Sequence, residues 1–316
     1  MQTNIKDKLL VCLFNNDDKL MMKFSNQFKL MEEFISNLQK EICSALELQD
    51  VVKFSEDIWK RNEGGGGKTK VIQNGKIFEK GGVNISSVYG ELPEILTKQF
   101  SVEKSNFAAC GISLVIHPFT PKIPTIHMNV RYFEMENGKS WFGGGIDLTP
   151  YYPYPEDFVY FHKVMREACE SVMPNSYSEF KKECDEYFTI KHRNEMRGIG
   201  GIFFDYKDGT NKVYFDLVQS TGNAFLKCYL PIIEKRKNEI YSEEDKMFQS
   251  FRRGRYVEFN LIYDRGTLFG LKTGGRTESI LMSLPPEVKF PYNYQPKQGS
   301  PQEEMVKFYQ PQNWIL

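Results

Sequence analysis

Polar side chains that could act on a ligand alternate with apolar ones along one segment in the middle of the chain. The polar face would carry Thr125, His127, Asn129 and Arg131, with Phe133 at its end, and the other face would carry Ile126, Met128, Val130 and Tyr132. This period of two predicts a β-strand. An ordinary strand of this kind leaves its polar face in water. A histidine, an amide and an arginine in succession are also typical of the wall of a ligand cavity.

The histidines of the chain are His117, His127, His162 and His192. Taken singly, each is more often a hydrogen-bonded structural residue than a ligand. As a group they allow either a metal site with open coordination positions or a pocket in which an imidazole transfers protons. Neither an HExxH motif nor paired carboxylates support the metal site, so a metal-dependent hydrolase is the weaker alternative.

Arginines close to a glycine, a histidine or an expected strand end are Arg131, Arg193, Arg197, Arg252, Arg253, Arg255, Arg265 and Arg276. A planar guanidinium is the side chain best suited to bidentate carboxylate binding. We expect Arg131, on the polar strand face, and Arg276, after two glycines, to meet an anionic ligand. Arg252 and Arg253 are expected on a solvated helix face.

Asp147 follows three glycines and Ile146 on an expected tight strand, where backbone can approach a ligand closely. Its carboxylate could accept N–H groups from that ligand. The alternative is that it caps the turn into Thr149 and Pro150.

Composition restricts the function classes. The 316 residues carry 41 Lys and Arg against 41 Asp and Glu, so no net basic field favours nucleic acid or an anionic membrane. No run approaches the roughly 18 apolar residues of a membrane span, and the N-terminus lacks the apolar core of a leader. Six scattered cysteines predict buried, reduced thiols. We therefore expect a cytoplasmic protein with a single domain over residues 1–316, of which 1–18 are expected to be poorly ordered.

Hydrophobic periodicity predicts the elements that must position these residues. Helices are expected at residues 19–48, 156–172, 177–197, 214–235 and 243–253, and strands around 113–117, 125–133, 201–206 and 255–264. Hairpin-like strand pairs with helices of mixed order predict an α+β fold, with a large, mainly antiparallel β-sheet flanked by helices on both sides.

A glycine run, Gly64 to Gly67, precedes Lys68 and Thr69. A phosphate-binding P-loop would need a glycine where Asn62 stands, and it would follow a β-strand, whereas residues 55–63 are polar. We therefore expect a mobile backbone segment here and no nucleotide site.

Six blocks of sequence are specific enough to indicate a family. They cover residues 62–84, 117–131, 141–152 (Trp-Phe-Gly-Gly-Gly-Ile-Asp-Leu-Thr-Pro-Tyr-Tyr), 191–205 (starting Lys-His-Arg-Asn-Glu-Met-Arg-Gly), 253–267 (starting Arg-Gly-Arg-Tyr-Val-Glu-Phe-Asn) and 274–286. In this order they resemble the oxygen-dependent coproporphyrinogen III oxidases, from about residue 20 to the C-terminus. Six long blocks in order are far more specific than any single motif.

The resemblance implies an enzyme that uses dioxygen to convert the ring A and B propionates of coproporphyrinogen III to vinyl groups, with loss of two CO2. The product would be protoporphyrinogen IX, for haem synthesis. It also implies a homodimer built on a flat antiparallel sheet, with no required cofactor and a doubtful role for a divalent metal. The alternative from another class is a non-catalytic tetrapyrrole carrier, which the presence of Asp147 and the arginines disfavours.

The resemblance also implies roles for individual residues. The substrate-binding set would be Ser113, Asn129, Val130, Arg131, Gly274, Gly275 and Arg276. His127 would donate a proton, Asp147 would lie near the pyrrole nitrogens, and His127 or Arg131 would steady developing charge. His117, His127, His162 and His192 match positions assigned as candidate metal ligands in bacterial members. We hypothesise that a pyrrole peroxide takes a proton from the propionate β-carbon before CO2 leaves.

Overall fold

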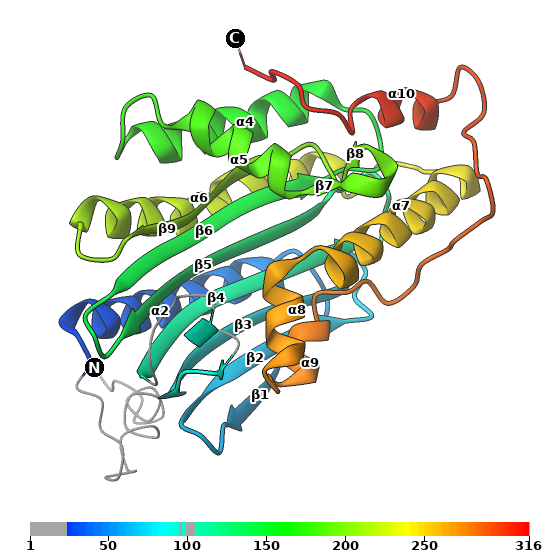
Figure 1. Ribbon diagram of the computed structural model, residues 1–316. Helices are drawn as coiled ribbons and strands as arrows, with labels where there is room; N and C mark the ends of the chain where they lie inside the picture. Colours follow the sequence, from blue (N-terminus) through cyan, green and yellow to red (C-terminus); the bar gives the residue numbers. More distant parts are fainter. Residues whose placement is uncertain (1–23, 95–96, 99–104, 316) are drawn as a thin grey trace.

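A seven-stranded antiparallel sheet runs through the computed structural model, which describes residues 24–94, 97–98 and 105–315 (Figure 1). Its strands are β1 (Ser55–Lys60), β2 (Gly65–Gln73), β3 (Phe78–Glu91), β4 (Asn106–Pro118), β5 (Thr125–Met135), β6 (Ser140–Thr149) and β9 (Gly201–Asp208). They lie in the order β1-β2-β3-β4-β5-β6-β9, and each neighbouring pair is antiparallel. The predicted mainly antiparallel sheet is confirmed.

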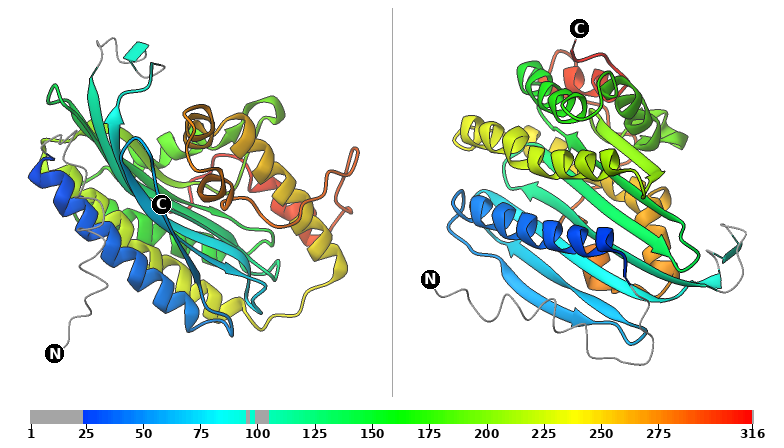
Figure 2. Two further views of the ribbon diagram at one scale, coloured as in Figure 1. Left: turned by 90° about the horizontal axis from the view of Figure 1, so that it is seen from below. Right: turned by 90° about the vertical axis from the view of Figure 1, so that its left-hand side faces the viewer.

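Helices cover both faces of this sheet (Figure 2). They are α2 (Asn26–Glu47), α4 (Pro155–Glu170), α5 (Tyr177–Tyr187), α6 (Lys212–Arg236), α7 (Glu243–Ile262), α8 (Arg265–Lys272), α9 (Thr277–Leu281) and α10 (Pro301–Lys307). A small hairpin, β7 (Thr189–Ile190) and β8 (Glu195–Met196), is joined by the 3-10 turn η1 (Lys191–Arg193). Helices α2 and α6 pack on one face, and α7, α8 and α9 lie over the other, so the α+β prediction is confirmed.

Strand β5 shows why the two faces differ. Ile126, Met128 and Val130 are fully buried in the main core, under α2 and α6. His127 and Arg131 alternate with them and remain partly exposed on the opposite face. Each buried aliphatic side chain contributes about 1.5–3 kcal/mol, and a shift of one residue would expose all of them. The core therefore fixes the register that presents the polar side chains.

Capping residues begin the helices that the sequence predicted. Ser25 accepts a hydrogen bond from the Phe28 amide at the start of α2, and Ser242 and Asp245 form a capping box at the start of α7. The helices expected at 156–172 and 214–235 are confirmed as α4 and α6. Residues 19–23 of the first expected helix, and the N-terminal residues 1–18, lie outside the described residues.

Residues 255–264 were expected to form a strand, and this prediction is wrong. The helix that begins at the capping box continues to Ile262. Its buried side chains Phe248, Arg252, Tyr256 and Phe259 are spaced by three and four, as a helix requires. The alternating apolar residues from Val257 to Tyr263 therefore do not form a strand, because the helical spacing of the buried side chains decides the structure.

The helix expected over residues 177–197 is also shorter than predicted. It ends at Tyr187, and the chain turns back through the β7/β8 hairpin, where Asn194 adopts a positive φ of 52°. Phe188 and Ile190 are buried against Phe259 of α7. Tertiary packing against α7 therefore overrides the local helical pattern.

The glycine run lies in a strand, not in the expected mobile segment. Residues 65–67 pair with β3 and are buried, and the polar residues 55–60 form β1. A Cβ placed on Gly67 would come within 2.4 Å of the Trp59 ring. The glycine is thus needed for close packing against Trp59.

Arg252 and Arg253 are not solvated, contrary to expectation. Both side chains are 1% exposed. Arg252 pairs with Glu195 at 2.9 Å, and Arg253 pairs with Glu79 at 2.7 Å. These ion pairs tie α7 to β8 and to β3.

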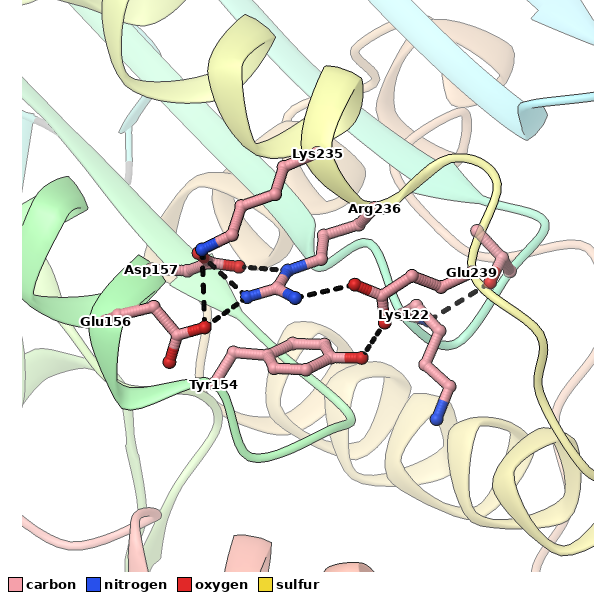
Figure 3. Close-up of polar contacts among 8 residues, drawn as sticks. Lys122, Tyr154, Glu156, Asp157, Lys235, Arg236 and Glu239 are labelled. Atoms are coloured by element: carbon pink, nitrogen blue, oxygen red, sulfur yellow. Dashed lines mark hydrogen bonds and ion pairs between the residues drawn. The ribbon is translucent and has the colours of Figure 1, made fainter.

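A further buried arginine joins the ends of α4 and α6 (Figure 3). Arg236 Nε donates to Asp157 at 2.7 Å and Nη1 donates to Glu239 at 2.6 Å, while its guanidinium lies 3.4 Å from the Tyr154 ring centre. Glu156 and Asp157 are in the first turn of α4, and Lys235 and Arg236 are in the last turn of α6. Each pair therefore also complements its own helix dipole.

We predict that Arg236→Met destabilises the protein by about 3–5 kcal/mol, because the buried Asp157 carboxylate loses the buried guanidinium that contacts both of its oxygens and keeps only the half-exposed Lys235. Lys235→Met is the matched control: Lys235 contacts the same carboxylate at 3.0 Å, but its side chain is 48% exposed. The control should cost less than about 1 kcal/mol. Urea unfolding of both variants measures the difference, and equal losses would contradict the prediction.

Candidate active site

The face of the sheet opposite α2 and α6 carries a row of small and polar side chains across its middle strands. Ser113 on β4 is paired in register with Asn129 on β5, and His127 is paired with Asp147 on β6. Side chains in directly opposed positions lie next to each other. The structure therefore brings together four of the residues predicted from the sequence.

Asp147 and His127 form the centre of this row. His127 Nδ1 lies 2.7 Å from Asp147 Oδ1. Because a carboxylate accepts, this nitrogen carries the proton, which leaves Nε2 to accept or donate one. Within the described residues Nε2 makes no hydrogen bond, and the His127 side chain is 21% exposed. The imidazole can therefore exchange a proton with a ligand.

A buried arginine holds Asp147 from the other side. Arg197 Nη2 donates to both carboxylate oxygens, at 2.9 and 2.7 Å, and both side chains are 2% exposed. Burial opposes ionisation of Asp147, but Arg197 and the His127 hydrogen bond outweigh it and hold the Asp147 pKa below its ordinary value. Asp147 is thus a buried carboxylate that stays ionised. The alternative in which it only caps a turn does not account for these contacts.

Aromatic rings and α7 fix the position of Arg197. Its guanidinium carbon lies 4.3 Å from the ring centre of Phe188, 4.4 Å from Tyr256 and 4.9 Å from Phe259. Nη1 donates to Asn260 Oδ1 at 2.7 Å. Cation–π contacts of this kind gain strength when the charge is desolvated. Three of these partners belong to the part of the chain that was wrongly expected to be a strand.

Arg131 lies along the same face and reaches across β6. Its Nη2 is 2.7 Å from Asp205 Oδ2 on β9, and Arg265 Nη2 approaches the same oxygen at 3.4 Å. The strand in between contributes Gly143, where an added Cβ would come 3.0 Å from Arg131 Nε and 2.7 Å from Asp205. The glycine therefore provides the space in which Arg131 crosses the sheet.

Gly274, Gly275 and Arg276 lie at the other side of the same face. Gly274 adopts a positive φ of 69°, which glycine tolerates best. Arg276 pairs with Asp57 of β1 and donates to Ser279 Oγ at 3.0 Å. Neighbouring strands lie about 4.8 Å apart. Strand β1, which Arg276 contacts, and strand β5, which carries Arg131, are four steps apart in the sheet, or about 19 Å.

Val130 is the member of the predicted substrate-binding set whose side chain lies on the opposite face, where it is fully buried in the core. Only its backbone could meet a ligand on the polar face. The histidines also do not converge: across residues 24–94, 97–98 and 105–315, no three His, Cys, Asp or Glu side chains form a group that could hold a metal ion. His162 contacts Tyr177 and Ile199, and His192 contacts Tyr263 and Glu258.

Comparison with known proteins identifies the family of the chain. A family model described as coproporphyrinogen III oxidase matches residues 30–314. The chain belongs to the coproporphyrinogen III oxidase family. Among curated relatives of this family, the oxygen-dependent coproporphyrinogen-III oxidase of Prochlorococcus marinus is 48% identical over 315 residues. That alignment covers 90% of this chain and 92% of the relative.

The roles of Arg197, Asp205 and Asn260 within the site of this family member were not predicted from the sequence. Arg197 was noted only as one of the arginines close to a glycine, a histidine or an expected strand end. Asp205 lies inside the strand expected around residues 201–206, with no nearby partner in sequence. The contact between Asn260 and Arg197 was not predicted, because residues 255–264 were expected to form a strand instead of a helix.

We predict that Asp147→Asn destabilises the protein by about 3–5 kcal/mol at pH 7, because Arg197 is left as an unpaired buried charge. The ionised Asp147 stabilises the fold above its unfolded pKa of about 3.9, and this contribution is lost as the pH falls through the lower pKa of the folded state. Urea unfolding at pH 7 and at pH 3 should therefore show a smaller difference between the two proteins at pH 3.

The double variant Asp147→Asn, Arg197→Met serves as the control for that prediction. It removes the charge that the single variant leaves unpaired, so it should recover part of the lost stability at pH 7. A double variant as unstable as the sum of the two single variants would show that the pair is not coupled.

Proposed function

We propose that this chain converts the ring A and B propionates of coproporphyrinogen III to vinyl groups, with dioxygen as the oxidant, giving protoporphyrinogen IX for haem synthesis. The observation that carries the proposal is membership of the family, together with 48% identity to an oxygen-dependent member over most of both chains. The arrangement of His127, Asp147 and Arg131 on one accessible face supports it.

The substrate carries four carboxylates, and two of the arginines on this face could each meet one of them. Arg131 and Arg276 lie on opposite sides of the row that contains Ser113 and Asn129. Guanidinium groups bind carboxylates with charge-assisted hydrogen bonds. In this proposal the two arginines hold propionates. The Asn129 amide and the Ser113 hydroxyl contact the macrocycle, and the backbone of Gly274, Gly275 and Val130 completes the site.

Each conversion removes one CO2 and one hydride equivalent, which is a proton and two electrons. We infer that dioxygen adds to the electron-rich pyrrole and that the resulting pyrrole peroxide takes the proton from the β-carbon. The bond to the carboxylate carbon then breaks with loss of CO2, its electron pair forms the vinyl double bond, and the peroxide leaves the ring as hydrogen peroxide, which carries away the two electrons. The Asp147 carboxylate fixes the orientation of His127, so that Nε2 can donate to the developing oxygen anion. Direct contact between Asp147 and the pyrrole nitrogens stays a prediction, since Arg197 and His127 already bond to it.

No step of this proposal uses a metal or an organic cofactor. His117, His162 and His192 each have both ring nitrogens in hydrogen bonds within the protein. A shared metal would require several of these bonds to break and the rings to move together. The chemistry is therefore assigned to the substrate, dioxygen and the side chains on the polar face.

The first experiment incubates chelator-treated protein with coproporphyrinogen III, with and without oxygen, and separates the oxidised porphyrins by chromatography. We expect protoporphyrin only with oxygen. Unchanged substrate under both conditions, also after metal add-back, would overturn the oxidase and favour the tetrapyrrole carrier. Conversion without oxygen that depends on added metal would favour a metal-dependent enzyme.

We predict that His127→Asn lowers kcat by about 10²–10⁴-fold, the usual effect of losing a general acid or base. Asparagine can still donate to Asp147, so KM should stay within about threefold of the wild type. His192→Gln is the control, because His192 is exposed and pairs with Glu258 outside the row. An unchanged kcat in His127→Asn would remove this histidine from the mechanism.

A homodimer and a cytoplasmic location are also proposed. Leu261, Ile262, Phe269 and Leu271, from the end of α7 and from α8, are 38–51% exposed, and exposed apolar side chains of this kind support an interface. Sedimentation equilibrium should give twice the chain mass.

Within the described part of the chain, no helix has the length and apolar character of a membrane span. The five cysteines described there are free and buried, as a reducing compartment allows.

A further inference from the structure

The segment from Arg276 to Leu284, called the capping segment below, is held against the polar face of the sheet by three hydrogen bonds in addition to the pair between Arg276 and Asp57. Ser279 Oγ lies 2.8 Å from Thr69 Oγ1, the Ser283 carbonyl lies 2.9 Å from His117 Nε2, and the Leu284 carbonyl lies 2.9 Å from Lys80 Nζ. The segment directly follows Gly274 and Gly275 and begins with Arg276. Its position therefore sets the position of the proposed substrate-binding loop.

The contact with Ser283 determines the tautomer of His117. A carbonyl oxygen only accepts, so Nε2 must carry a proton. The side chain is fully buried, and burial, with Arg253 nearby, lowers the His117 pKa well below its ordinary value. The ring is thus neutral, and Nδ1 accepts from Thr125 Oγ1 at 3.1 Å, which in turn accepts from the Tyr151 hydroxyl at 2.7 Å.

This tautomer does not suit a metal ligand. A neutral imidazole has a single nitrogen lone pair, and in His117 the lone pair accepts the hydrogen bond from Thr125. Coordination at Nδ1 would break that bond inside a buried site. Coordination at Nε2 would break the bond to Ser283 instead.

Lys80 makes the second contact from the same side of the sheet. It is paired in register with His117 on the neighbouring strand, so the two donors lie side by side and hold adjacent carbonyls of the capping segment. Met282 packs over Gly82, two residues after Lys80 on β3, where an added Cβ would come 2.4 Å from its sulfur. Polar and apolar contacts thus converge on residues 282–284.

We propose that His117 and Lys80 are positioning residues that hold the capping segment, and with it Gly274 to Arg276, over the substrate-binding face. The part of this inference that concerns substrate rests on the proposed function; the part that concerns the segment does not. His117 would then act through Ser283 and would touch neither the porphyrinogen nor a metal.

Hydrogen–deuterium exchange of the amides of residues 277–284 tests the contacts without substrate. His117→Ala and Lys80→Met should each speed exchange by about tenfold, as expected for one lost buried hydrogen bond. His117→Gln, whose side-chain amide can still donate to Ser283, should keep most of the protection. The control Tyr229→Phe removes a bond of the same kind, to the Pro124 carbonyl, and should leave this segment unchanged.

Steady-state kinetics then test the consequence for substrate. We expect KM to rise by about tenfold in His117→Ala and Lys80→Met, with a smaller change in kcat and near-normal values in His117→Gln. Unchanged exchange in Lys80→Met and His117→Ala would overturn the proposal. So would loss of tightly bound metal and of kcat in both His117 variants with normal exchange. If His117→Ala and Lys80→Met exchange faster but the wild type shows no oxidase activity, the positioning role stands and only the proposed function is refuted.

Discussion

The ion pair between Asp147 and Arg197 is the interaction on which the rest of the site depends. Both side chains are 2% exposed, and a charge buried to this extent is tolerated only when it is paired and hydrogen-bonded. The pair requires β6, the segment before β9 and α7 to be in place together, because α7 supplies Tyr256, Phe259 and Asn260 around the guanidinium. The orientation of His127 follows from the same carboxylate.

The division of the sheet into two faces makes this arrangement possible. One face is filled by the core under α2 and α6, so the register of β5 is fixed by Ile126, Met128 and Val130. The other face can then carry side chains selected for chemistry. Glycines on β6 leave space above that strand, and Arg131 uses it to reach Asp205. A bulkier β6 would separate the two charges.

Local sequence pattern was enough to predict β5, its polar face and the position of Asp147. In each case the signal is carried by neighbouring residues, because the period of two is a property of one strand. The errors arose where a distant partner decides the structure. Residues 255–264 alternate like a strand but belong to a helix that begins at Ser242, and Tyr187 ends α5 because Phe188 packs on that helix. Arg197 and Asp147 are 50 residues apart in the sequence, so no local sequence pattern predicts that they pair.

The arginines proposed to bind substrate are each held by an aspartate of the sheet, Arg131 by Asp205 and Arg276 by Asp57. Such a pair fixes the guanidinium in one orientation. A carboxylate that binds there then costs less side-chain entropy, which is about 2 kcal/mol for a free arginine. The aspartates also cancel part of the positive charge, so one carboxylate gains little from either arginine alone. A ligand with carboxylates on both sides of a wide body gains from both, and this favours a tetracarboxylate macrocycle over a small anion.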